Sequence, residues 1–269
     1  MTKIITFSAI KGGVGKTTIA YNFGSWLADN KKKVLFIDLD HQCNLSQTYN
    51  VYDQKGSVGN ILNPKDEVVI HNVGENIDLI AGDMHLDDIE TLIENKTNKN
   101  MMLYLWLYDN YQKLHIDKYD YILIDCHPDF STATKNAIIV SDDILSPITP
   151  SEYGYKAKYN LKERLKELSE EAIDFTSHKS YVTANLYFLA NMLKHNTTSS
   201  RDLLNSLKDE KKSGDNSCIA YILYKELFNK SELNKISLSE MAKDHKLAIQ
   251  QRKFFGEVFK TFEDIENKL

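Results

Sequence analysis

A lysine- and glycine-rich segment near the start of the chain has the residue types of a phosphate-binding loop. It reads Lys11-Gly12-Gly13-Val14-Gly15-Lys16-Thr17-Thr18 and lies between an apolar run and a segment with helical spacing. Glycines let the backbone curl so that successive N–H groups point at phosphate oxygens, and the N-terminus of the following helix adds partial positive charge. In such a loop Lys16 reaches the β- and γ-phosphates, and Thr17 offers its hydroxyl to Mg²⁺. The segment therefore predicts binding of a nucleoside triphosphate with Mg²⁺.

An acidic side chain ends another apolar run. Asp125 directly follows residues 121–124, which read Tyr-Ile-Leu-Ile. Ligands of α/β folds bind at the carboxyl ends of the strands, and Mg²⁺ in proteins takes oxygen ligands while keeping several of its waters. We expect Asp125 to hold Mg²⁺ through water. A strand-terminal Asp alone is weak evidence, and its pairing with the phosphate loop strengthens the interpretation.

The elements that must position these groups alternate between strand and helix. An apolar run, a helix and a second apolar run within about 35 residues predict a βαβ unit, and such units build parallel sheets. We expect a doubly wound α/β fold with a mostly parallel sheet and helices on both faces, in a single domain over residues 1–269. The expected strands are residues 4–7, 34–38, 77–81, 121–125, 144–148 and 181–189, and the expected helices are residues 17–30, 101–114, 156–172 and about 250–269. Residues 195–200 and 208–217 read as exposed connections.

Composition narrows the class of protein. The chain has 269 residues, 42% of them hydrophobic, and a net charge of −5. Residues 1–150 hold 13 Lys and Arg against 20 Asp and Glu, a net of −7; the remainder holds 20 against 18, a net of +2. Any surface for a polyanion therefore belongs to the second half. We find no signal peptide and no apolar run near the 18 residues of a membrane span, so we expect a cytoplasmic protein.

The loop departs from the standard phosphate-loop pattern in two ways. Ile10 stands where the first glycine is usual, and an extra lysine, Lys11, opens the loop. With these features the chain resembles the deviant Walker A ATPases, most closely the ParA/Soj plasmid and chromosome partition ATPases. The resemblance implies that Lys11 reaches across an ATP-sandwich dimer to the partner's phosphates, which follows the logic of an arginine finger.

A second segment is similar to the family pattern D-x-D-P-Q-G-N. It reads Asp38-Leu39-Asp40-His41-Gln42-Cys43-Asn44. The resemblance implies that Asp40 orients the attacking water and that Asp38 lies near the magnesium shell, although two acids at a strand end can also simply cap the next helix. His41 replaces the usual proline and Cys43 the usual glycine, which leaves the path of this loop open. Residues 126–128, Cys-His-Pro, stand where the family has Thr-Pro-Pro.

Two later segments also resemble the family. Residues 147–153 are similar to P-x-x-P-[S/T]-E-[F/Y], and residues 191–201 to [N/T]-M-x-x-x-x-T-x-x-[S/T]. The resemblance implies that Asn191 and the backbone near Pro150 flank the adenine of ATP.

Three functions fit such an ATPase. The resemblance implies a partition ATPase that dimerises on ATP, binds non-specific DNA on the nucleoid, and is stimulated by a centromere-bound adaptor of the ParB-like or small ribbon-helix-helix type. The alternative is a MinD-like ATPase that binds membrane or positions another protein, which requires a basic amphipathic helix at the C-terminus. Residues 250–269 carry an apolar stripe but four cations and four acids, so no membrane contact is expected. The third is an iron–sulfur carrier like the nitrogenase iron protein, yet neither Cys43 nor Cys126 has a neighbouring cysteine at ligand spacing.

Overall fold

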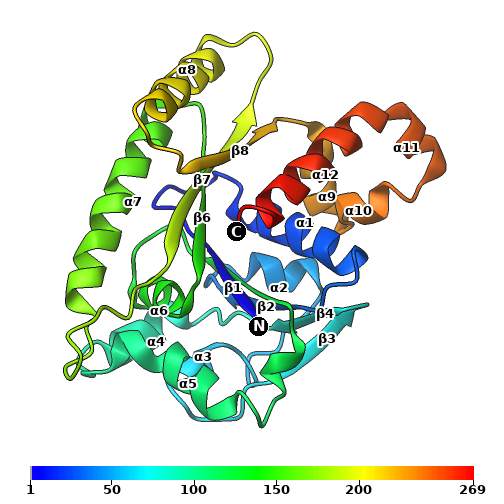
Figure 1. Ribbon diagram of the computed structural model, residues 1–269. Coiled ribbons are helices and arrows are strands. Elements are labelled where there is room, and N and C mark those ends of the chain that lie inside the picture. The colour runs from blue at the N-terminus through cyan, green and yellow to red at the C-terminus, as the bar shows by residue number, and fades with distance from the viewer. Residues whose placement is uncertain (1) are drawn as a thin grey trace.

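One eight-stranded sheet runs through the molecule (Figure 1). The computed structural model describes residues 2–269, without the side chains of residues 152–154. The strand order is β3-β4-β2-β5-β1-β6-β7-β8, and each neighbouring pair is parallel except β3 with β4, which is antiparallel. The strands are β1 (Lys3–Phe7), β2 (Val34–Leu39), β3 (Ile70–Gly74), β4 (Ile77–Ile80), β5 (Tyr121–Cys126), β6 (Asp143–Ile148), β7 (Asn185–Leu193) and β8 (Cys218–Leu223).

Helices cover both faces of the sheet, which confirms the expected doubly wound α/β fold (Figure 1). They are α1 (Lys16–Asp29), α2 (Asn44–Thr48), α3 (Gly59–Leu62), α4 (Leu86–Ile93), α5 (Met102–Asn110), α6 (Thr132–Val140), α7 (Glu152–Glu171), α8 (Thr198–Lys212), α9 (Glu226–Asn234), α10 (Leu238–Met241), α11 (His245–Gln250) and α12 (Arg252–Glu266), with short 3₁₀ turns η1 (Lys99–Met101) and η2 (Ile116–Lys118).

Strand β2 shows why both faces are covered. Its side chains alternate, so that Val34 and Phe36 pack with α1 and α12, while Leu35 and Ile37 pack with α3, α5 and α6. Successive side chains of a strand point to opposite faces, and a strand that is apolar at every position must therefore be buried on both. All six residues of β2 are buried.

Helix α12 packs on the α1 face through one apolar stripe. Phe255, Val258, Phe262 and Ile265 are buried, and the ring of Phe262 lies 5.7 Å from that of Phe23 in α1. These side chains recur three or four residues apart, which is the spacing of one helix face. The stripe is thus used for packing within the chain.

Several expected boundaries were wrong. The strand expected over residues 181–189 is β7, which starts four residues later and ends at Leu193. Tyr181 instead contacts the segment that follows α7: its N–H donates to the carbonyl of Ala172 and its hydroxyl to Asp174. The connection expected over 208–217 is half helical, since α8 continues to Lys212. The helix expected over 101–114 ends at Asn110, and the edge strands β3 and β8 were not expected at all.

Candidate nucleotide site

The phosphate loop joins β1 to α1 and uses glycine where the backbone needs it. Gly13 and Gly15 have φ of +70° and +89°, a left-handed region that side chains with a Cβ rarely adopt. A Cβ on Gly15 would also lie 2.6 Å from Nδ2 of Asn191, whereas one on Gly13 would meet nothing within 4 Å. Two independent constraints therefore require glycine at position 15.

The loop leaves several backbone donors without a partner. Within residues 2–269, the backbone N–H groups of residues 12–16 make no hydrogen bond to another backbone or side-chain acceptor. They precede the N-terminus of α1, where the helix dipole is positive. Lys16 is only 6% exposed, at the first position of that helix. A buried lysine and a row of unpaired N–H groups are a binding site for an anion with several oxygens.

Lys11 lies at the entrance of the loop and is turned toward the end of β6. Its Nζ lies 2.9 Å from the hydroxyl of Ser151, the residue after Pro150. The sequence pattern over residues 147–153 includes Ser151 but did not predict this contact. In this conformation the side chain of Lys11 is directed to its own chain.

Asn191 lies within β7, two residues beyond the expected end of this strand, and its side chain supports the phosphate loop. Its Nδ2 donates to the carbonyl of Val14 over 2.8 Å, and the residue is 6% exposed. The amide thus fixes the position of the loop backbone.

Pro150 lines a cavity of about 280 Å³ with Tyr155, Ser199 and Leu203, beside the Lys11–Ser151 contact. The predicted adenine contacts of Pro150 and Asn191 stay predictions.

Three carboxylates meet at the carboxyl edge of β2 and β5. Asp38 and Asp125 are register partners on these adjacent parallel strands, and both are fully buried. Asp40 follows β2 and is 5% exposed. The parallel sheet therefore brings together acids that are 85 to 87 residues apart in the chain.

The two buried acids differ in their partners. Asp38 accepts hydrogen bonds from the N–H and the hydroxyl of Ser46 and from the N–H of Asp40. Both carboxylate oxygens of Asp125, in contrast, are buried and accept no hydrogen bond of normal geometry from the described residues. Ser46 was missed by the sequence interpretation, because nothing in the residue pattern links a serine in α2 to an acid eight positions earlier.

Burial disfavours the charged form of both acids. Loss of solvent raises the pKa of Asp125 to about 8, with a further increase from the nearby charge of Asp38, and Thr17 and Lys16 oppose this only in part. Burial likewise raises the pKa of Asp38 to about 6, although the hydrogen bonds from Ser46 lower it. An orphaned, buried carboxylate beside a threonine hydroxyl fits a place for a divalent cation, which would keep the charged form of Asp125 stable.

The loop after β2 is left-handed at the position where the family pattern has glycine. Cys43 has φ 52° and ψ 32°, a left-handed conformation, directly before α2. Its N–H donates to the carbonyl of Asp40, and the N–H of Gln42 donates to Oδ1 of Asp40. The departures at His41 and Cys43 thus leave Asp40 fixed on a tight turn.

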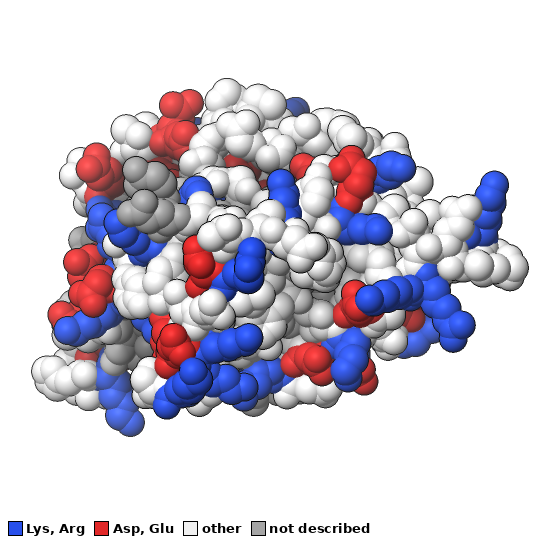
Figure 2. Space-filling view, turned by 90° about the horizontal axis from the view of Figure 1, so that it is seen from above, with Lys and Arg blue, Asp and Glu red and all other residues white. Residues whose placement is uncertain are grey.

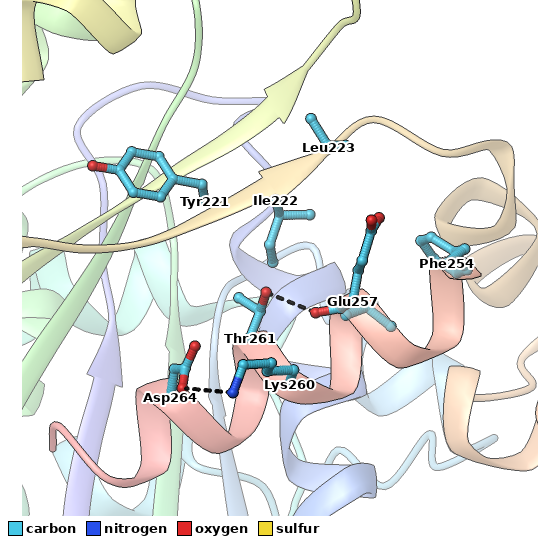
Figure 3. Close-up of a pocket in the computed structure, with 9 residues that line it drawn as sticks. Tyr221, Ile222, Leu223, Phe254, Glu257, Lys260, Thr261 and Asp264 are labelled. Atoms are coloured by element: carbon cyan, nitrogen blue, oxygen red, sulfur yellow. Dashed lines mark hydrogen bonds and ion pairs between the residues drawn. The ribbon is translucent and has the colours of Figure 1, made fainter. Parts of the chain in front are cut away.

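Another groove lies between β8 and α12, and Figure 3 shows its lining residues. It has a volume of about 290 Å³; Tyr221, Ile222 and Leu223 come from the strand side. On α12, Lys260 and Asp264 form an ion pair of 3.8 Å (Figure 3). None of the residues of the phosphate loop lines this groove.

Comparison with known proteins identifies the family of the chain. A family model described as an AAA domain matches residues 2–177. The virulence plasmid ParA family protein pGP5-D of Chlamydia psittaci is 33% identical over 166 residues, which cover 60% of this chain and 62% of the relative. The sporulation initiation inhibitor protein Soj of Bacillus subtilis is 33% identical over 158 residues, which cover 57% and 60%. The chain belongs to the ParA/Soj-type P-loop ATPases.

A solved structure shares the fold of this ParA/Soj-type chain over its full length. A putative plasmid partition protein from Borrelia burgdorferi B31, bound to AMPPNP, superposes with a TM-score of 0.78 at 24% identity and covers 100% of both chains. In sequence, the chain spans about half to two thirds of the length of the curated relatives it matches. No helix among residues 2–269 combines the length and the apolar character needed to cross a membrane.

Proposed function

We propose that the chain is an ATP-dependent partition ATPase for plasmid or chromosome DNA. As an ATP-sandwich homodimer it binds DNA non-specifically, and it hydrolyses ATP when a centromere-bound adaptor, ParB-like or of the ribbon-helix-helix type, stimulates it. The observation that carries the nucleotide part is the convergence of unpaired loop N–H groups, buried Lys16 and the orphaned carboxylate of Asp125 at one edge of the sheet. We propose that the protein acts in the cytoplasm, on the nucleoid when ATP is bound, and that residues 1–269 form one domain.

The binding roles follow from these positions. The N–H groups of residues 11–18 and the ammonium of Lys16 hold the phosphates, with Thr17 and Asp125 holding Mg²⁺ and Asp38 close behind them. When bound, Mg²⁺ supplies charge stabilisation for the β- and γ-phosphate oxygens. The hydrogen bonds from Ser46 hold the carboxylate of Asp38 in place, so Asp38 acts mainly by its negative charge beside Asp125.

The hydrolytic roles fall to Asp40 and Lys11. Asp40 has one oxygen engaged by the N–H of Gln42, which leaves Oδ2 to accept a hydrogen bond from the attacking water. Lys11 must leave Ser151 to reach phosphates of a second chain, so its contact over 2.9 Å belongs to the chain before dimerisation. We expect Asp40→Ala to retain ATP and to accumulate the dimer, and Lys11→Ala to bind ATP without dimerising. Size-exclusion chromatography with light scattering measures both, and normal turnover by Asp40→Ala contradicts the assignment.

Exposed cations at one end of the molecule fit the proposed binding to DNA. Lys246, Arg252 and Lys253 are exposed around the start of α12, and no ion pair within residues 2–269 engages Lys246 or Arg252. Figure 2 shows Lys and Arg gathered at the protruding end of the molecule, while acids are interspersed elsewhere on that face. Lys212 and Lys243, in contrast, are paired with Asp209 and Asp29. Contacts to DNA phosphates need cations on one face and carry no sequence code.

Co-sedimentation with duplex DNA of unrelated sequences tests this function. We expect binding with ATP and not with ADP, weakened by salt, and a loss in the double variant Lys246→Gln/Arg252→Gln. The matched control is Lys65→Gln/Lys113→Gln, which removes two exposed cations from the β3 and α5 region. Equal binding by both double variants overturns the assigned surface, and absence of ATP-dependent DNA binding overturns the partition function.

The same experiment with anionic liposomes tests the membrane alternative. The four apolar side chains of the α12 stripe are at most 6% exposed. A helix must free its apolar face to enter a lipid interface. This burial supports DNA over lipid as the surface that the ATP dimer binds.

A further inference from the structure

Two histidines meet beside the hydrolytic carboxylate. His41 follows β2 and His127 follows β5, which are adjacent parallel strands with Leu39 and Cys126 as their last register partners. The imidazole rings lie 4.1 Å apart between centroids, tilted by 37°. Both positions carry proline in the ParA-type pattern given above, so this pair is a feature of the present chain and not of the pattern.

Each imidazole is oriented by a carboxylate. Nδ1 of His41 lies 3.1 Å from Oδ1 of Asp87, and Nδ1 of His127 lies 3.1 Å from Oδ2 of Asp129. An ionised carboxylate only accepts hydrogen bonds, so a neutral imidazole in this contact carries its proton on Nδ1. The contact of His127 is a hydrogen bond, so the lone pair of its Nε2 is then available, and His41 offers its Nε2 in the same way when Nδ1–H donates to Asp87. Metal-binding histidines have this second contact to a carboxylate, which fixes the tautomer and raises the basicity of the ligand.

Asp40 supplies a third ligand. One ligand atom from each of Asp40, His41 and His127 lies within 4.8 Å of the others. Ligands about 2.0–2.1 Å from a tetrahedral ion lie roughly 3.3 Å apart, so the three atoms must close by at most about 1.5 Å. The side chains of His41 and His127 are 20% and 27% exposed, which leaves them room to rotate and gives an ion access from solvent.

We propose that Asp40, His41 and His127 form a site for a divalent transition-metal ion such as Zn²⁺, distinct from the Mg²⁺ that accompanies ATP. Two imidazoles and one carboxylate suit Zn²⁺ and leave a fourth position open, whereas Mg²⁺ prefers oxygen ligands throughout. An ion at this site takes Asp40 as a ligand and so prevents its carboxylate from orienting water. Occupation therefore inhibits ATP hydrolysis, a consequence that rests on the role proposed for Asp40.

Binding is measured first, on the metal-stripped full chain without nucleotide. Zn²⁺ is titrated by calorimetry, and Co²⁺ is used as a second probe because its visible absorption reports the coordination geometry. We expect one ion per chain, a loss of affinity of at least 100-fold in His127→Ala and in His41→Pro, and a loss of about 10- to 100-fold in Asp87→Asn, which removes only the orienting carboxylate. Circular dichroism verifies that each variant is folded.

His85→Ala is the matched control. His85 also contacts a carboxylate, Asp88, over 3.5 Å, but it belongs to no cluster of three ligands within the described residues. Its variant should bind Zn²⁺ like the unaltered chain. Equal affinity in His127→Ala and His85→Ala overturns the site, as does the absence of a Zn²⁺ or Co²⁺ signal at micromolar concentration.

Inhibition is measured second, with Mg²⁺ and ATP in excess. Micromolar Zn²⁺ should slow ATP hydrolysis by the unaltered chain and by His85→Ala, and should leave His41→Pro unaffected. Zn²⁺ binding without this inhibition keeps the metal site and overturns the role of Asp40. A chain that shows no ATPase activity at all overturns the proposed function, while the binding experiment still decides the site.

Discussion

Asp125 should destabilise the protein when no cation neutralises it. The carboxylate is fully buried, its oxygens have no partner of normal geometry within the described chain, and its pKa is raised from 3.8 to about 8. The folded state therefore holds the proton more tightly than the unfolded state. As pH rises from about 4 to 8, stability is lost, because the unfolded chain ionises freely and the folded chain does not.

The size of this loss follows from the shift. Between pH 3.8 and pH 7 each pH unit costs about 1.4 kcal/mol, which gives at most about 4 kcal/mol at pH 7. Asp125→Asn removes the ionisation and keeps the shape. For a chain of this size about 4 kcal/mol corresponds to a rise in Tm of roughly 8–16 °C at pH 7, and the gain should vanish near pH 4.

Thermal unfolding by circular dichroism between pH 4 and pH 8, without divalent cations, measures the effect. Asp117→Asn, at an exposed carboxylate, is the control and should shift Tm little. Addition of Mg²⁺ and ATP should then raise the Tm of the unaltered chain more than that of Asp125→Asn. A Tm difference that does not grow from pH 4 to pH 8 refutes the argument that burial of this charge opposes folding.

Three other changes test the phosphate loop and the packing of two helices. Gly15→Ala should weaken ATP binding, measured by calorimetry, far more than Gly13→Ala. Both variants pay about 1–2 kcal/mol for a left-handed backbone, but only at position 15 does a Cβ collide with a side chain. Equal losses of affinity would assign the effect to the backbone alone. Phe262→Ala, at a fully buried ring, should lower the free energy of unfolding in urea by about 3–5 kcal/mol, and a loss below 1 kcal/mol contradicts the packing of α12. Lys158 is completely buried and paired with Glu210 and Asp215, so Lys158→Ala should cost about 3–5 kcal/mol in the same assay, and Lys158→Met nearly as much, because both variants leave the acids unpaired. A much smaller loss in Lys158→Met would show that the aliphatic part and not the ion pair matters.

The phosphate loop and the acids could be predicted because each follows a strongly apolar run. Strands such as residues 34–39 and 121–126 are apolar at nearly every position, and parallel pairing then forces their ends to one edge of the sheet. The positions of Asp38 and Asp125 follow from that rule alone. The family pattern added the roles, which the structure leaves as proposals.

What could not be predicted depends on contacts between distant segments. The later start of β7 reflects the hydrogen bonds of Tyr181 to Ala172 and Asp174, just after α7. The edge strand β3 has a neighbour on only one side and reads Ile-His-Asn-Val-Gly, a weak apolar signal, whereas β8 is hydrophobic at all six positions, so its sequence did contain the signal of a strand. The contact of Lys11 with Ser151 spans 140 residues, and that of Asn191 with Val14 spans 177. Spacing along the chain contains no information on either contact.

The hydrogen bond from Asn191 to Val14 makes β7 a mechanical partner of the phosphate loop. A ligand that displaces the loop must either stretch this 2.8 Å bond until it breaks or carry the strand along with it. β7 is paired with β8 along its other edge, and α12 packs next to β8. Force applied at the phosphates therefore has a continuous covalent and hydrogen-bonded path to the far edge of the sheet, more than 200 residues away in sequence.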